Sequence, residues 1–361
     1  MFNEKLVPMK KLFILMSLFL SSSVSWAETR PYKMGFSAFL YDHTPEAVMN
    51  TVNFLKNNGD MYTIKFDESI PWRSLIDNQP LPGEFLKKLG EYAIHRLPNH
   101  KLQLSLTAVK DSHDGLLNDL DGSLPQETYN SSVIVEAYIR YCEKMIEVFR
   151  PDYVLTGLNS NELYLENPNA WKAYEKFSKA VINKLKSRHR NILFAESINL
   201  NKLINPEKEV KKTKYKRDII NFSRHFDFFP VTLHPFGLAY STEKEYQSAF
   251  DFLHKSVRKP IAIAATSQIS QSVALEEITL QSSQQIQNDY LKILFKNARK
   301  KRYLYVSYWM HRDCDALLKY LPPAAQQSVN IIKDAGLVDE NGNHRSAFNT
   351  WKAEFLRAYR K

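Results

Sequence analysis

Strand-like and helix-like segments alternate eight times along this chain of 361 residues. Each short apolar, β-prone run is followed by a longer run with helical spacing, which is typical of an α/β fold with a parallel sheet. Eight such units predict a closed (β/α)8 TIM barrel. The alternative is an open doubly wound sheet, but the Gly-rich phosphate loop that usually follows its first strand is absent. No internal repeat or linker marks a second domain.

The expected strands cover residues 33–39, 60–67, 102–109, 153–158, 191–199, 228–234, 259–265 and 303–309. The expected helices cover residues 44–58, 83–97, 131–149, 170–186, 215–225, 241–257, 275–301 and 347–359. Thr44 followed by Pro45 is a typical helix start, because Thr caps the first turn and Pro fits the first helical position. Residues 111–128 form a long polar loop.

The N-terminus has the composition of a secretory signal peptide. Lys10 and Lys11 precede an apolar run over residues 12–20, and Ser25 and Ala27 provide the small residues that signal peptidase needs. We therefore expect a mature protein of residues 28–361, secreted or periplasmic. A stable membrane anchor is not expected, since spanning the bilayer takes roughly 20 apolar residues. Met9 is a second candidate start, which would make the first eight residues an upstream extension.

The formal net charge is +10, and it falls to +8 without residues 1–27, which hold three Lys and one Glu. Much of this charge lies in the basic runs 208–217 and 296–302. These runs are solvated helix faces, or they favour an acidic glycan or a membrane surface. No nucleic-acid motif is present. Cys142 and Cys314 form neither a disulfide framework nor a zinc-ligand pattern, and no cofactor is expected.

Side chains at the C-terminal ends of barrel strands meet at one open face, where barrel enzymes place their active sites. Carboxylates and amides there can bind sugar hydroxyls, and indole rings can stack on a pyranose face. No helical His spacing suggests a metal site. A purely structural role is an open alternative for three of these residues. Asp67 could cap a helix, His234 could be a hydrogen-bonded structural histidine, and Asp313 could bridge to a neighbouring loop. The strand-end residues are Asp67, Glu68, Trp72, Asn161, Glu162, Glu196, Asn199, His234, Gln268, Trp309, His311 and Asp313.

The segment 151–163, which ends its expected strand in Asn161-Glu162, resembles the fourth strand of the clan A glycoside hydrolases. That strand ends in Asn-Glu in those (β/α)8 barrels. The resemblance implies that Glu162 is a general acid/base, and that Asn161, Trp72, His234, Trp309 and Asp313 contact a poly- or oligosaccharide. Residues 64–72 and 336–351 also resemble loops and the final helix of secreted barrels of this kind.

The resemblance fails at strand seven. The family places its nucleophilic Glu in a motif that aligns with residues 260–266, where Ala265 takes the nucleophile position. Three hypotheses stay open. Glu162 could act as acid with Glu196 or Asp67 as base in an inverting hydrolysis, which needs carboxyl groups about 6.5–9.5 Å apart. The protein could be a catalytically inactive glycan-binding barrel, or the strand-seven alignment could be wrong and the chemistry different.

Overall fold

The computed structural model describes residues 29–66, 68–93, 96–275 and 278–360. Its main sheet is parallel, with the strand order β5-β4-β3-β2-β1-β11-β8-β7-β6. The strands are β1 (Lys33–Ser37), β2 (Met61–Phe66), β3 (Lys101–Leu106), β4 (Tyr153–Leu155), β5 (Leu193–Ala195), β6 (Ile198–Asn199), β7 (Phe229–Leu233), β8 (Ile261–Thr266) and β11 (Tyr305–Tyr308).

The two ends of this sheet meet in one broken strand. β5 pairs with β4, β6 pairs with β7, and only Glu196 and Ser197 separate β5 from β6. The backbone N–H of Ser197 donates to the carbonyl of Gly157, which continues the β4 edge across the break. The sheet therefore closes on itself, and the expected (β/α)8 barrel is confirmed.

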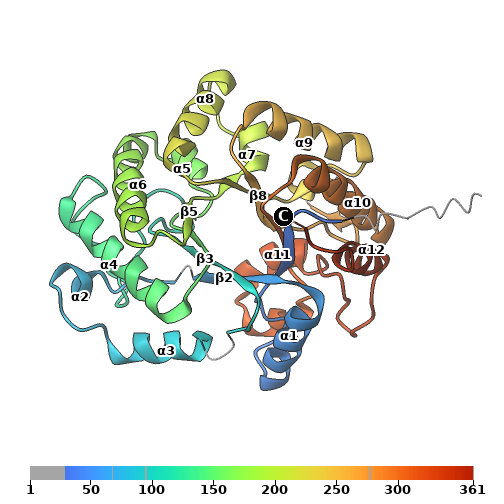
Figure 1. Cartoon of the computed structure of the whole chain (residues 1–361), viewed down its shortest axis with the longest axis horizontal. Coiled ribbons are helices and arrows are strands. Elements are labelled where there is room, and N and C mark those ends of the chain that lie inside the picture. The colour runs from blue at the N-terminus through green and yellow to red at the C-terminus, as the bar shows by residue number, and fades with distance from the viewer. Residues whose placement is uncertain (1–28, 67, 94–95, 276–277, 361) are drawn as a thin grey trace, which may run out of the picture.

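Long helices surround the sheet (Figure 1). The outer helices are α1 (Pro45–Asn58), α3 (Gly83–Ala93), α4 (Ser132–Phe149), α6 (Pro168–Arg188), α8 (Lys212–Phe222), α9 (Glu243–Ser256), α10 (Gln284–Lys301) and α12 (Ser346–Phe355). Thr44 caps α1 by accepting a hydrogen bond from the backbone N–H of Ala47, as expected. Trp351 of α12 donates to the carbonyl of Asn58, 2.8 Å away, so the last helix packs against the first unit of the barrel.

The loops at the strand ends carry structure that the sequence pattern did not predict. They contain α2 (Trp72–Ile76), α5 (Asn161–Glu166), α7 (Leu200–Ile204), α11 (Pro323–Ile332) and the 3-10 turns η2 (Pro235–Leu238) and η3 (Asp315–Tyr320). A further 3-10 turn, η1 (Ser223–His225), continues α8 within the helix expected over residues 215–225. The helix expected over 275–301 begins only at Gln284, because Ser283 caps it. Part of the preceding segment pairs as β9 (Val273–Ala274) and β10 (Thr279–Leu280).

The barrel interior is apolar and aromatic at its closed end, where the rings of Tyr153, Phe228 and Tyr305 pack together. A second, smaller apolar cluster, which includes Ile269 and Met310, lies under the loops that follow β8 and β11. The expected signal peptide lies outside the described residues. Within the described ranges, no helix is long and apolar enough to cross a membrane.

Candidate functional site

The open end of the barrel carries partly accessible side chains on several strand ends. Thr232 near the end of β7 is one of them, and its hydroxyl donates to Oδ1 of Asn159, 2.7 Å away. Asn159 follows β4, so the bond passes over strand five, which lies between β4 and β7. Both side chains must therefore face the mouth. The mouth residues with accessible surface are Ser37, Lys65, Asn159, Glu162, Asn199, Thr232, His234, Ala265 and Trp309.

Ala265 lies directly beside Thr232. The register of β7 and β8 places Thr232 opposite Ala265, and neighbouring strands are about 4.8 Å apart. The position that the resemblance assigns to a nucleophile therefore presents a methyl group. The side chain that β4 contributes nearby is the amide of Asn159. A retaining glycosidase needs two carboxyl groups about 5–5.5 Å apart, and neither Asn159 nor Ala265 provides one.

Glu162 lies in α5 rather than at the end of β4. Its Oε1 accepts a hydrogen bond from Nδ2 of Asn199, 2.8 Å away, and Glu162 is partly exposed. Asn199 ends β6, so Glu162 lies over the strand-five side of the mouth. Asn161 points elsewhere: it is fully buried and donates to the hydroxyl of Tyr215 on α8 at 2.8 Å. Asn161 therefore fastens α5 to the outer layer, and the structure does not bring it to the accessible surface of the mouth.

The carboxyl group of Glu196 is turned away from the mouth. It is fully buried and accepts hydrogen bonds from the hydroxyls of Tyr174, at 2.7 Å, and Ser178, both on α6. Ser160 donates to it as well, at 2.5 Å. Burial raises the pKa of Glu196 above its ordinary value. The expectation that Glu196 could serve as a base beside Glu162 does not fit this orientation, because strand five breaks at Glu196 and directs it against α6.

The two tryptophans of the predicted site differ sharply in exposure. Trp72 begins α2, is 1% exposed, and donates from Nε1 to the carbonyl of Leu117 at 2.7 Å. It packs on Tyr138 and offers no face to a ligand. Trp309 is partly exposed after β11, where it contacts Phe39 at 5.1 Å between ring centroids. Of these two residues, Trp309 is the one whose side chain is accessible.

His234 lies at the mouth between β7 and β8. Its Nδ1 is 2.8 Å from the hydroxyl of Ser267, and its ring lies edge-on to Trp309. Loss of solvent lowers the pKa of His234 to about 4, so the ring is neutral at neutral pH. A neutral imidazole fixed by Ser267 can exchange one hydrogen bond with a ligand hydroxyl. His234 and Trp309 thus form one wall of the mouth.

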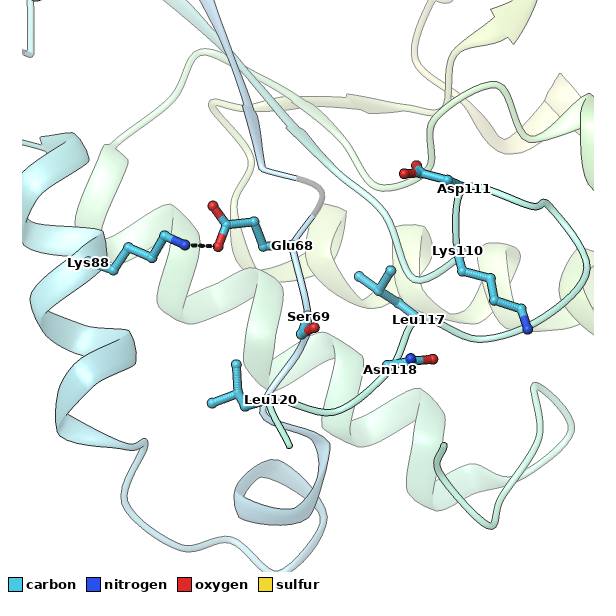
Figure 2. Close-up of a pocket in the computed structure, with 8 residues that line it drawn as sticks. All are labelled: Glu68, Ser69, Lys88, Lys110, Asp111, Leu117, Asn118 and Leu120. Atoms are coloured by element: carbon cyan, nitrogen blue, oxygen red, sulfur yellow. Dashed lines mark hydrogen bonds and ion pairs between the residues drawn. The ribbon is translucent and has the colours of Figure 1, made fainter. Parts of the chain in front are cut away.

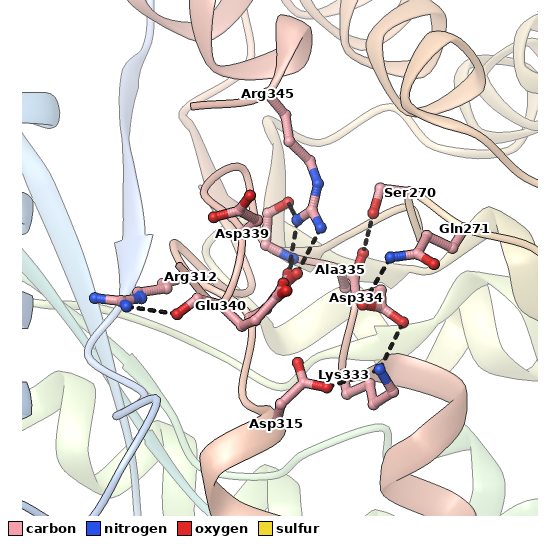
Figure 3. Close-up of polar contacts among 12 residues, drawn as sticks. Ser270, Gln271, Arg312, Asp315, Lys333, Asp334, Ala335, Asp339, Glu340 and Arg345 are labelled. Atoms are coloured by element: carbon pink, nitrogen blue, oxygen red, sulfur yellow. Dashed lines mark hydrogen bonds and ion pairs between the residues drawn. The ribbon is translucent and has the colours of Figure 1, made fainter. Parts of the chain in front are cut away.

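Asp313 is not part of this surface. Its two carboxylate oxygens accept from the guanidinium of Arg345 at 2.7 and 2.5 Å, and its side chain is fully buried. Figure 3 shows Arg345 above the acidic side chains of this region. Oxygens of Asp313, Asp315 and Glu340 lie within 4.8 Å of one another. Arg345 and Lys333, which pairs with Asp315 at 2.7 Å, already neutralise two of the three carboxylates, so this group is a structural ion-pair network.

A pocket of about 600 Å³ adjoins the mouth between the loops that follow β2 and β3 (Figure 2). In Figure 2, Glu68 and Lys88, an ion pair, lie on one side of the pocket and Asp111 on the other. Leu117 and Leu120 add apolar surface, a mixture that suits a sugar unit.

Asp67, the other predicted base, lies outside the described residues. The remaining strand-end candidates Gln268 and His311 are buried, and Gln268 donates to Tyr246 of α9.

Asn159 and Thr232 are mouth residues that the sequence did not single out. The Asn-Glu pair of the sequence motif, Asn161 and Glu162, lies in the helix α5. Asn159 is the first side chain with hydrogen-bonding groups after Thr156, and its φ of 48° is a conformation that Asn adopts more readily than most residues. An Asn just after a strand, at a position that can adopt left-handed backbone, is the sequence signal that could have identified Asn159 as a mouth residue.

No family model matches the chain, and no curated protein matches it. Solved structures do. An exo-β-1,4-mannosidase from an Opitutaceae bacterium has a TM-score of 0.65 at 12% identity, covering 92% of this chain and 60% of its own. A GH5_18 protein of Bifidobacterium longum, solved with Manβ1-4GlcNAc, has a TM-score of 0.62 at 11% identity. The match covers 91% of this chain and 80% of that protein. The GH53 catalytic domain of Ignisphaera aggregans has a TM-score of 0.56 at 15% sequence identity, and the match covers 87% of this chain and 88% of that domain.

These likenesses establish a glycoside hydrolase-like (β/α)8 fold. At such low identity they show the fold alone, because many functions share this barrel. The chain spans 60% of the mannosidase that it resembles.

Proposed function

We propose that this protein is a secreted or periplasmic carbohydrate-binding barrel that holds an oligo- or polysaccharide at its mouth without hydrolysing it. The observation that carries the proposal is the arrangement of Asn159, Thr232 and Ala265. Where a retaining enzyme needs two carboxyl groups, this mouth presents an amide, a hydroxyl and a methyl group. An amide and a hydroxyl can still bind sugar hydroxyls.

The accessible side chains supply the other contacts that a sugar needs. Trp309 offers an indole face for stacking, and His234 beside it offers a neutral imidazole. Glu162, held by Asn199, presents a carboxylate that can accept hydrogen bonds from ligand hydroxyls. In this proposal Glu162 has a binding role.

A second candidate function is inverting hydrolysis, with Glu162 as general acid and Asp67 as base. The accessibility of Glu162 favours it, and so does the sequence position of Asp67 directly after β2. Glu196 is a poor choice for the base because its carboxyl group is enclosed by hydroxyls from α6 and the β4 loop.

The test is a binding and turnover screen of residues 28–361 against β-mannan, mannooligosaccharides, β-galactan and bacterial exopolysaccharides. The first two are chosen because similar folds include mannan-active proteins. Glu162→Gln and Asp67→Asn are measured beside Glu91→Gln, a control on the exposed surface of α3.

Binding of one glycan class by wild type and Glu91→Gln, with no product over long incubation, is the expected result. Product that disappears in Glu162→Gln or Asp67→Asn would replace this proposal with the hydrolytic one. Absence of binding to every glycan would reject both.

A further inference from the structure

The segment that follows strand five, which contains α7 and the first turns of α8, is strongly basic. Residues 200–217 contain seven Lys and Arg and only two Glu. We call the cations of this segment the basic rim. Five of them are exposed and two are partly exposed. The basic rim consists of Lys202, Lys208, Lys211, Lys212, Lys214, Lys216 and Arg217.

The basic rim borders the candidate site directly. It starts immediately after Asn199, which caps α7 by accepting from the backbone N–H of Lys202 and also holds Glu162. Lys208 pairs with Glu166 of α5 at 3.1 Å. Figure 1 shows α5, α7 and α8 grouped at the same edge of the barrel. A ligand that leaves the mouth on the strand-five side would therefore meet this segment.

Neighbouring acids pair with only part of the rim. Lys202 pairs with Glu207 at 2.6 Å, and Lys214 with Asp218 at 2.7 Å. Counting Glu162, Glu166, Glu175, Glu207, Glu209 and Asp218 together, seven cations face six carboxylates. Among the described residues, neither Lys211 nor Lys212 has a carboxylate partner; Lys212 reaches only the amide oxygen of Asn205 at 3.2 Å.

Protein stability does not account for this placement of charge. Lys211 and Lys212 stand at the start of α8, which has no acidic residue in its first turn and no side-chain cap. The N-terminal end of a helix carries positive partial charge, so cations there are unfavourable for folding. A charge arrangement that weakens local structure and lies at the edge of a ligand site is expected to have a role in binding.

A further cationic side chain, Lys65, lies at the mouth on the other side. Lys65 is exposed near the end of β2. In β2 it is separated by two positions from Thr63, whose hydroxyl lies 3.3 Å from that of Ser307 on β11. β1 lies between β2 and β11, so Thr63 faces the barrel interior, and Lys65 faces the same way one step closer to the mouth.

We propose that the bound glycan is acidic, with carboxylates on its sugar units that pair with the basic rim and with Lys65. This inference rests on the proposed function and adds the chemical class of the ligand. Lysine suits the role because its flexible stem lets one amino group follow carboxylates at varying positions along a polymer. A neutral mannan would use the mouth but would gain nothing from the rim.

The experiment compares two ligands that differ in charge alone. A polyuronate and the same polymer after chemical reduction of its carboxyl groups are titrated into residues 28–361, with vesicles of an anionic phospholipid as a third probe. The rim variant is Lys211→Gln/Lys212→Gln/Lys214→Gln, and Lys65→Met tests the mouth. The matched control, Lys296→Gln/Lys300→Gln/Lys301→Gln, removes the same charge from exposed positions of α10.

The polyuronate should bind more tightly than its reduced form. The rim variant should lose about tenfold in polyuronate affinity, as expected for three exposed ion pairs. The control should change it by less than about twofold. High salt should remove most of the difference between the two polymers.

Equal binding of both polymers, with no effect of the rim variant, would overturn this inference and leave neutral glycan binding intact. Rim-dependent binding to vesicles without discrimination between the polymers would assign the rim to a membrane surface instead. Failure to bind any glycan, charged or neutral, would reject the proposed function itself.

Discussion

The hydroxyl of Thr232 and the side-chain amide of Asn159 are joined by a 2.7 Å hydrogen bond that passes over the broken fifth strand of the barrel. The bond fixes Asn159 in the mouth, and Ala265 lies beside Thr232 on the neighbouring strand. Asn159, Thr232 and Ala265 give this part of the mouth a preorganised polar surface without a carboxylate. Such a surface can orient sugar hydroxyls, whereas it cannot attack an anomeric carbon.

Replacing Thr232 with Val tests this relationship, because Val keeps the shape and removes the donor. The carbonyl oxygen of Asn159 then loses its partner, and the free energy of unfolding should fall by about 1 kcal/mol. Glycan affinity should fall as well, since Asn159 is no longer fixed. Urea denaturation and calorimetric titration measure the two effects. Thr232→Ser, which retains the hydroxyl, should restore most of the binding; equal affinities for Thr232→Val and wild type would contradict the role of the bond.

The two tryptophans should respond differently to truncation. Trp309→Ala removes an accessible indole and should lower glycan affinity by about tenfold, with a small effect on stability. Trp72→Ala empties a buried site and leaves the carbonyl of Leu117 unpaired, so it should cost about 3–5 kcal/mol of stability. Its affinity, measured at low temperature where it is still folded, should stay close to wild type. The reverse pattern would show that Trp72 reaches the ligand.

Breaking the buried ion pair between Asp313 and Arg345 should destabilise the fold without affecting binding. Asp313→Asn leaves the guanidinium of Arg345, which is 4% exposed, without its charge partner and should cost about 3–5 kcal/mol. Replacing both residues together, Asp313→Leu with Arg345→Met, should recover part of that loss, because no unpaired charge remains. Chemical denaturation of wild type, Asp313→Asn and the double variant measures these changes in the free energy of unfolding. A selective loss of glycan affinity in Asp313→Asn, at unchanged stability, would place Asp313 in the site.

His311 should make the protein less stable in acid. It is 3% exposed between Phe54 and Tyr41, and burial lowers its pKa to about 3. In the unfolded chain the pKa of His is about 6.5. Below that pH the unfolded state therefore binds a proton that the folded state does not bind until the pH approaches 3. Stability contributed by His311 is therefore complete above about pH 6.5 and is lost as the pH falls toward 3.

His311→Phe keeps an aromatic ring in this position and removes the titration. The slope of unfolding free energy against pH between 4 and 6 should decrease by up to about 1.4 kcal/mol per pH unit. Parallel curves for variant and wild type would show that His311 is not shielded from protons. The effect of Glu196 on the pH dependence of stability has the opposite sign. Because its pKa is raised in the folded state, it contributes stability below its unfolded pKa, and this contribution is lost as the pH rises.

Much of the architecture could be predicted from the sequence alone. The alternation of short β-prone runs with helical runs fixed eight units and hence the barrel, and local signals such as Thr44 before Pro45 located helix starts. These features depend on residues close together in the chain. The helix expected from residue 275 was misplaced at its start because Ser283 provides the cap and the preceding segment forms a hairpin.

The direction of each side chain beyond a strand end was decided only by the tertiary structure. Within a strand, the period of two assigns faces, but this periodicity ends where the strand ends. From there a side chain follows whatever partner reaches it: Tyr174 of α6 for Glu196, and Arg345, more than thirty residues away, for Asp313. The sequence by itself thus determined the barrel and the strands that surround its mouth. Long-range hydrogen bonds and burial decided that Asn159, Glu162 and Trp309 face the mouth while Glu196, Trp72 and Asp313 serve the fold.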